Sequence, residues 1–283
     1  MQGIFAIRKP SGPSSQDCVG KLKRIFTNSS HYTPDQVNRR KKQFIKIGHG
    51  GTLDPLADGV LVIGVGSGTK QLQKYLGDCK KTYVATCLFG CSTTSYDSEG
   101  AAIGWSGVSK LTDDLIAGCL DKFRGQITQI PPAFSALKMD GMPLYEYARK
   151  GISLPRRIEP RECEILELTT SSLTLEHEYQ FPSKDATEKE ISFAKEVTGV
   201  DLSGGTRLEK GPCVDFTFTV SSGTYIRSLI HDIATELGVQ GHMVRLTRVA
   251  QSEFELGKNV IDMEIFDQPE EEWWPVLKEA LSV

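Results

Sequence analysis

The sequence lacks the cysteine patterns that mark a zinc site or a disulfide framework. Its seven cysteines are scattered, and no two of them have C-x-x-C spacing. It also lacks an apolar run of the roughly eighteen residues that a membrane span requires, and Met1 does not begin a basic, then apolar leader. We therefore expect no metal site and no membrane segment. We expect an intracellular, reducing compartment, and the sequence does not choose between nucleus, mitochondrion and cytoplasm.

The sequence also has little of the positive charge that is typical of nucleic-acid-binding proteins, since its formal net charge is −3. That charge is unevenly distributed. Residues 258–283 hold seven acids and two bases, whereas residues 21–46 hold eight bases and one acid. A run of charge is usually a solvated face, but a patch that follows RNA phosphates is an equally good interpretation here. Its densest part is Arg39, Arg40, Lys41 and Lys42.

The basic run leads directly into a glycine-rich segment, residues 46–61, in which four of sixteen residues are glycine. Glycine permits backbone conformations that other residues avoid, so we expect a close-packed loop. Pro55 disfavours helix at Asp54, which places that carboxylate on a turn or an extended stretch, ahead of an apolar strand at residues 60–65. An ordinary turn aspartate explains the same residues. A phosphate-binding P-loop is a weak alternative, because Gly59 is followed by Val60 and not by lysine.

Hydrophobic periodicity predicts both strands and helices over the rest of the chain. Strands are expected at residues 3–9, 80–90 and 213–220 and within 161–179, and helices at about 15–26, 111–123 and 144–149 and after Tyr225. Residues 91–100 are expected to form a loop. Residues 183–211 have mixed charges and few aromatics, which predicts a surface insertion that is poorly ordered or weakly helical.

Several motifs of this chain resemble those of the TruB family of RNA pseudouridine synthases. The longest is Gly48-His49-Gly50-Gly51-Thr52-Leu53-Asp54-Pro55-Leu56-Ala57-Asp58-Gly59, which resembles the segment that carries the catalytic aspartate of that family. Shorter matches are Lys9-Pro10, Thr69-Lys70, Lys81-Thr82-Tyr83, residues 130–138 and Gly223-Thr224-Tyr225-Ile226-Arg227. Together they span nearly residues 3–249, apart from insertions near 27–46 and 183–211, and they are most similar to fungal members that modify tRNA.

The resemblance implies an α+β fold, with a mixed, largely antiparallel central sheet flanked by helices. It implies a catalytic domain at residues 1–257, followed by an acidic tail, 258–283, that packs on the domain or trails it. The family's usual RNA-binding PUA domain needs more residues than follow 249, so we expect none.

The resemblance also implies the chemistry. Asp54 would attack the target uridine, Arg227 would pair with Asp54, and the Tyr83 ring would pack on the base. A purely structural interpretation fits the same residues, in which Tyr83 is a core residue of its strand and Arg227 caps its helix or pairs with Asp232. The Lys9-Pro10 motif would support the active-site loop. The substrate-binding set that the resemblance implies is His49, Lys70, Tyr225, Leu246, Lys9 and Arg248.

The expected reaction is isomerisation of uridine 55 in the T-loop of tRNA, with no cofactor and no metal. The expected partner is the T-arm of tRNA, with mRNA hairpins of the same shape as further candidates, and the expected state is a monomer. The alternative is a non-catalytic RNA-binding or tRNA-folding module.

Overall fold

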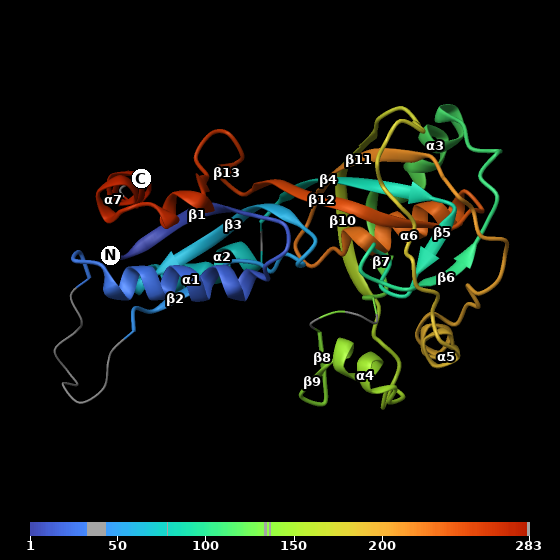
Figure 1. Ribbon diagram of the computed structural model, residues 1–283, viewed down its shortest axis with the longest axis horizontal. Helices are drawn as coiled ribbons and strands as arrows, with labels where there is room; N and C mark the ends of the chain where they lie inside the picture. Colours follow the sequence, from blue (N-terminus) through green and yellow to red (C-terminus); the bar gives the residue numbers. More distant parts are fainter. Residues whose placement is uncertain (33–43, 78, 133–134, 136, 282–283) are drawn as a thin grey trace. The chain divides into compact units, whose positions relative to one another are not determined.

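The fold is described from a computed structural model, which covers residues 1–32, 44–77, 79–132, 135 and 137–281 (Figure 1). The chain forms two compact units: Met1–Tyr83 with Leu246–Val283, and Val84–Arg245. Two strands, β4 (Lys81–Phe89) and β12 (Gly241–Gln251), run from one unit into the other. The strands pair mainly in antiparallel fashion, with parallel pairs as well, and helices flank them, so the expected fold class is confirmed.

The first unit contains both ends of the described chain. Its strands lie in the order β14-β1-β3-β12, with β2 paired to β3 and β13 paired to β12. Its elements are β1 (Gly3–Lys9), α1 (Ser15–Asn28), β2 (Ile47–His49), β3 (Asp58–Val65), the 3-10 helix η1 (Gly66–Gln71), α2 (Leu72–Leu76), β13 (Phe254–Glu255), β14 (Ile261–Asp262), η3 (Met263–Asp267) and α7 (Glu270–Ala280).

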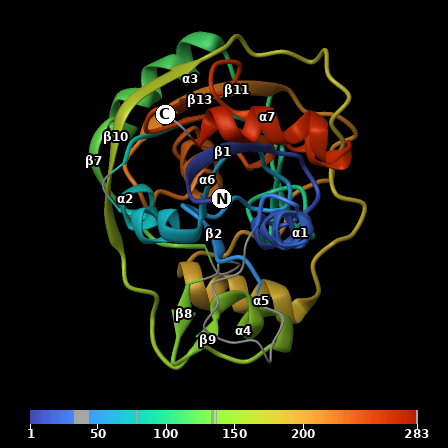
Figure 2. The same ribbon diagram turned by 90° about the vertical axis from the view of Figure 1, so that its left-hand side faces the viewer.

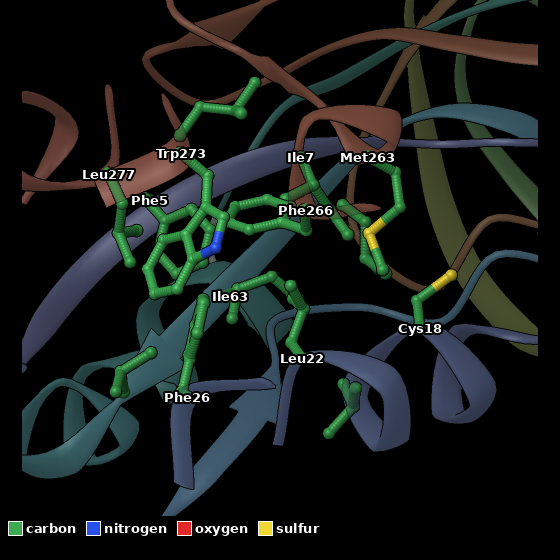
Figure 3. Close-up of a cluster of buried hydrophobic side chains, with 14 of the residues drawn as sticks. Phe5, Ile7, Cys18, Leu22, Phe26, Ile63, Met263, Phe266, Trp273 and Leu277 are labelled. Carbon is green, nitrogen blue, oxygen red and sulfur yellow. The ribbon is translucent and has the colours of Figure 1, made fainter. Parts of the chain in front are cut away.

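Alternation along β1 gives this unit a core on each face of its sheet. Phe5 and Ile7 pack with Phe26 of α1 and Trp273 of α7, as Figure 3 shows, while Ala6 packs on the opposite face with α2. Figure 2 shows α7 next to β1. The acidic segment 258–283 therefore supplies a strand and a helix to this core, and Glu271, Glu272 and Glu279 of α7 are exposed.

The second unit has strands in the order β4-β11-β10-β7, with β10 antiparallel to both of its neighbours. Helix α6 buries most of its residues, and Phe216 and Phe218 of β11 are fully buried. Its elements are β5 (Cys91–Thr93), β6 (Ala102–Trp105), α3 (Asp113–Cys119), η2 (Leu120–Phe123), β7 (Gly125–Gln129), β8 (Lys138–Met139), β9 (Met142–Pro143), α4 (Leu144–Lys150), β10 (Arg161–Thr170), α5 (Glu188–Thr198), β11 (Cys213–Val220) and α6 (Ile226–Glu236).

The structure departs from the expected elements where pairing or capping outweighs composition. Residues 91–100 are not all loop, because β5 finds hydrogen-bond partners on β6. Residues 171–179 lie outside the named strands, since β10 ends at Thr170. Residues 183–211 contain α5, whose N-terminus is closed by a reciprocal capping box between Thr187 and Glu190. That Thr-x-x-Glu spacing is typical of a helix N-terminus and could have been recognised in the sequence.

Candidate active site

The candidate catalytic carboxylate lies on the loop that joins two antiparallel strands, β2 and β3. Asp54 is half-buried near the middle of residues 50–57, and its carbonyl accepts a hydrogen bond from the Ala57 amide at 3.1 Å. The turn before β3 depends on Gly59, which has φ of 109° and whose missing side chain makes room for the backbone of Arg248. Any larger residue at that position would meet both strain and a clash.

Three side chains from the start of the chain hold the second half of this loop. Lys9 is fully buried, and its ammonium donates to the carbonyls of Ala57 at 2.6 Å, Pro10 at 2.9 Å and Pro55 at 3.2 Å. Ser11 donates to the Leu56 carbonyl at 2.8 Å. The Ser15 hydroxyl donates to the carbonyl of Leu53 at 3.0 Å and accepts from the Leu53 amide at 2.8 Å. Lys9 thus supports the active-site loop, and its burial leaves no ammonium surface for RNA.

Two side chains of β12 hold the first half of the loop. The Arg248 guanidinium donates to the carbonyls of Val60 at 2.7 Å, Gly51 at 3.1 Å and Thr52 at 3.5 Å. The Gln251 amide donates to the carbonyls of Gly50 at 2.6 Å and Tyr75 at 3.1 Å. Arg248 is 1% exposed and Gln251 is fully buried. The expectation that Arg248 contacts substrate therefore does not fit its surroundings, because its donors are directed at the loop backbone.

As a result, every backbone carbonyl from Gly50 to Ala57 accepts a hydrogen bond from within this unit. A loop with its backbone fixed at each residue loses little further freedom when a substrate binds. The rate of a reaction depends steeply on how well the reacting group is held in place. The arrangement suits a carboxylate that must meet one atom of a substrate.

The remaining expected residues of this unit surround the loop in different ways. The hydroxyl of Tyr83 accepts from Arg248 at 3.4 Å, and the same guanidinium lies 5.9 Å from the centre of its ring. Burial, with the positive charge of Arg248, lowers the pKa of His49, so this imidazole is neutral at physiological pH. Leu246 is buried on β12, and Lys70 is exposed at the end of η1.

The second unit presents a buried arginine together with an aspartate that sequence reasoning missed. Arg227, near the start of α6, is 6% exposed, and its Nη1 lies 3.5 Å from Oδ2 of Asp97 and 3.4 Å from the Ser95 carbonyl. The other carboxylate oxygen of Asp97 accepts from the Ser95 hydroxyl at 2.5 Å and the Glu99 amide at 3.1 Å. Residues 92–97 resemble a loop of the TruB family, but no spacing in the sequence links Asp97 to Arg227, which lies far along the chain.

Tyr225 sits at the position before α6, where the first amides of the helix need partners. Its backbone is held from both sides by Gln129, whose Oε1 accepts from the Tyr225 amide at 2.8 Å and whose Nε2 donates to the Tyr225 carbonyl at 3.0 Å. Gln129 is 3% exposed. It is a second positioning residue that the sequence did not reveal.

Asp54 belongs to one unit and Arg227 to the other, so the ion pair between them stays a prediction. The dense bases Arg39, Arg40, Lys41 and Lys42 lie outside the described residues. Within the described part of the chain, no group of three or more His, Cys, Asp or Glu side chains is arranged to hold a metal ion. In that same part, no helix has both the length and the apolarity to cross a membrane.

The chain is similar to proteins that are already known. Residues 39–189, just over half of the chain, match the family model described as "TruB family pseudouridylate synthase (N terminal domain)". The tRNA pseudouridine synthase 4 of Schizosaccharomyces pombe is 39% identical, with 94% of this chain and 83% of that protein covered. The protein of the same name from Saccharomyces cerevisiae is 38% identical, with 100% and 85% covered.

A solved structure, that of a Cbf5-Nop10-Gar1 complex, shares the fold. Its TM-score is 0.57 at 24% sequence identity, with 94% of this chain and 54% of that chain covered. The family match and the two yeast relatives carry the assignment, and both include the aspartate loop. This chain belongs to the TruB family of pseudouridylate synthases.

Proposed function

We propose that this chain isomerises a uridine of tRNA to pseudouridine, with Asp54 as the catalytic carboxylate. The observation that carries the proposal is the loop of residues 50–57, whose carbonyls are all hydrogen-bonded and which presents Asp54 between two strands. Family membership supports the reaction type, and the names of the two yeast relatives support tRNA as the substrate.

The reaction breaks the bond between uracil N1 and ribose C1′ and forms a bond between C5 and C1′, while C5 gives up its proton and N1 takes one up. No electron is gained or lost, and no group is donated, so a carboxylate and a closed pocket suffice. Asp54 either attacks C1′, as a retaining glycosidase does, or removes the proton from C2′. Both routes require the carboxylate in its ionised form, close to the sugar of a nucleotide that has left its stack, which costs a few kcal/mol.

Arg227 is the proposed cation beside Asp54. An opposite charge at close range favours the ionised carboxylate. Asp97 already pairs with Arg227 and receives two further hydrogen bonds of its own, so the guanidinium is held in one orientation. We assign Asp97 the role of a positioning residue that aims Arg227.

The other expected residues divide into two groups. Lys9 and Arg248 are buried against loop carbonyls, and we assign them positioning roles. The proposed contacts with RNA are then made by residues whose rings or apolar chains can face a base, and by one exposed ammonium. They are His49, Tyr83, Leu246, Tyr225 and Lys70.

The decisive experiment is Asp54→Asn in the full chain, assayed on a T-arm RNA hairpin by position-resolved pseudouridine mapping. Product should vanish, while RNA affinity stays within a few-fold. The matched control is Asp58→Asn, four residues later in the same motif. The Asp58 carboxylate accepts hydrogen bonds from Thr247 and Arg8 and has no proposed chemical role. The control should retain product formation. Product from Asp54→Asn would refute the assignment, and no product from the unaltered chain would favour a non-catalytic RNA-binding module.

We also propose the finer features that the family resemblance suggests. The target would be position 55, residues 1–257 would be the catalytic domain, and RNA hairpins of T-arm shape would be substrates, because the site recognises one loop. A single chain would suffice, since the Asp54 loop is fixed by residues of its own chain. All seven cysteines are buried and none of them forms a disulfide, which supports action in a reducing compartment.

A further inference from the structure

The second unit contains a small projecting segment that cannot complete its own core. Residues 138–158, called the arm below, comprise β8, β9 and the seven-residue helix α4. Four buried side chains of the arm form its apolar cluster: Met139, Leu144, Tyr147 and Ile158. A helix this short has little stability by itself, and a segment of this size rarely folds without outside support.

The missing part of that cluster comes from α5. Phe193 is 7% exposed and completes the arm cluster, and Val197, one turn later, packs against it. Ser153 of the arm also donates to the Glu196 carboxylate at 3.2 Å. Figures 1 and 2 both show α5 next to α4. The arm is therefore held by a helix that follows it by some thirty residues in the chain.

A second face of the same helix packs in another direction. Ala194 is buried with Ile103 of β6 and with Leu202, and Ile191 and Tyr96 pack against this second cluster. At 100° per residue, the direction of Ile191 and Ala194 is roughly 110° from that of Phe193 and Val197. One helix thus contacts two separate apolar clusters.

Both ends of the α5 segment are bound to β6 through backbone hydrogen bonds. Before the helix, the Ala186 amide donates to the Ala102 carbonyl at 2.7 Å, and the Ala102 amide donates to the Lys184 carbonyl at 2.8 Å. After the helix, the Trp105 amide donates to the Gly204 carbonyl at 2.8 Å. β6 is one strand of the hairpin whose loop contains Tyr96 and Asp97.

We propose that residues 184–205 are a brace, which fixes the arm against the hairpin loop that holds Asp97. The inference rests on the proposed function only for its consequence, because a link between the arm and Asp97 also links the arm to Arg227. The ring of Tyr96, which precedes Asp97, stacks on the His231 ring with 4.1 Å between the ring centres. It also packs against the cluster of Ile103, Ala194 and Leu202. Through these contacts the position of the arm and the position of Asp97 are linked.

The test is Phe193→Ala in the full chain, followed by hydrogen exchange of the free protein. We expect the amides of α4 to exchange at least about tenfold faster, because the arm loses the side chain that completes its core. Amides of β10 and β11, on the same unit, should be unchanged. Phe193→Leu should largely restore protection, since it returns an apolar group to the cluster. Ser192→Ala is the matched control, because Ser192 lies on the exposed face of the same helix.

Unchanged exchange in α4 would overturn the brace, whether or not α5 itself stays folded. Equal acceleration in α4, β10 and β11 would also overturn it, because that result means general destabilisation. The exchange result needs no RNA and should be the same in an Asp54→Asn background, so it is independent of the catalytic proposal. With T-arm RNA, Phe193→Ala should raise KM several-fold and change kcat by less.

Discussion

Replacement of Arg248 separates a loop-positioning role from RNA contact. Its guanidinium donates to three carbonyls and to the Tyr83 hydroxyl, and the two short bonds, to Val60 at 2.7 Å and to Gly51 at 3.1 Å, are the strong ones. Hydrogen bonds from a charged donor contribute about 1.5–3 kcal/mol each. Arg248→Met keeps the length of the side chain and removes all four bonds, so we expect unfolding free energy to fall by about 3–6 kcal/mol.

The same change should lower kcat far more than it raises KM. A shift of the reacting group by about an ångström costs on the order of a hundredfold in rate, whereas a side chain that is 1% exposed offers nothing for RNA to bind. Arg248→Lys should recover part of the stability, because a single ammonium can meet one or two carbonyls but cannot reproduce the planar fork.

The assays are urea unfolding and steady-state kinetics on a T-arm hairpin, with Arg245→Met as the control. Arg245 is exposed on the same strand, so its replacement should leave unfolding free energy within about 0.5 kcal/mol. A large rise in KM for Arg248→Met with unchanged kcat would show that Arg248 binds RNA and would refute the positioning role.

Two further outcomes are expected. Replacing Arg39, Arg40, Lys41 and Lys42 with neutral residues should weaken RNA binding. It should also flatten the plot of log affinity against log salt concentration, by up to about 0.7–0.9 in slope for each lost phosphate contact. An unchanged slope would exclude a phosphate-binding patch at these four residues. Burial lowers the pKa of His242 to about 4, below the ordinary value of 6.5. As pH falls, the unfolded chain therefore binds a proton at this residue before the folded chain does. The free energy of unfolding then decreases between about pH 6.5 and 4. His242→Phe should therefore gain unfolding free energy relative to the unaltered chain over that window, by up to about 3 kcal/mol at pH 4, and parallel pH profiles in urea unfolding would contradict this.

Much of the fold could be predicted because its signals are local. The strand at residues 3–9 contains an apolar run, and the helix after it is capped by Ser14, which forms a capping box with Asp17. The glycine loop could be recognised for the same reason, since Gly59 permits a positive φ and Pro55 fixes its own φ. By contrast, β5 has only three residues and depends on its partner strand β6, so no local sequence pattern predicted it.

The candidate site divides along the same line. Asp54, Tyr83 and Arg227 stand in contiguous motifs, and a motif can be recognised without knowing what it touches. The partners of these groups could not be recognised in that way. Asp97 meets Arg227 across 130 positions of sequence, and Gln251 meets the Gly50 carbonyl across 201. Such contacts follow from packing, which the linear order of residues does not record.

The amino-acid sequence by itself therefore determined the reaction class, and it predicted the carboxylate and the loop that presents it, because motif chemistry and backbone restriction are properties of neighbouring residues. Tertiary structure alone decided that Lys9 and Arg248 are buried supports of that loop, that Asp97 pairs with Arg227, and that α5 joins the arm to the hairpin. A buried cation must be satisfied by whichever carbonyls the fold brings to it, and an apolar face by whichever element covers it. Both are settled only when distant segments meet.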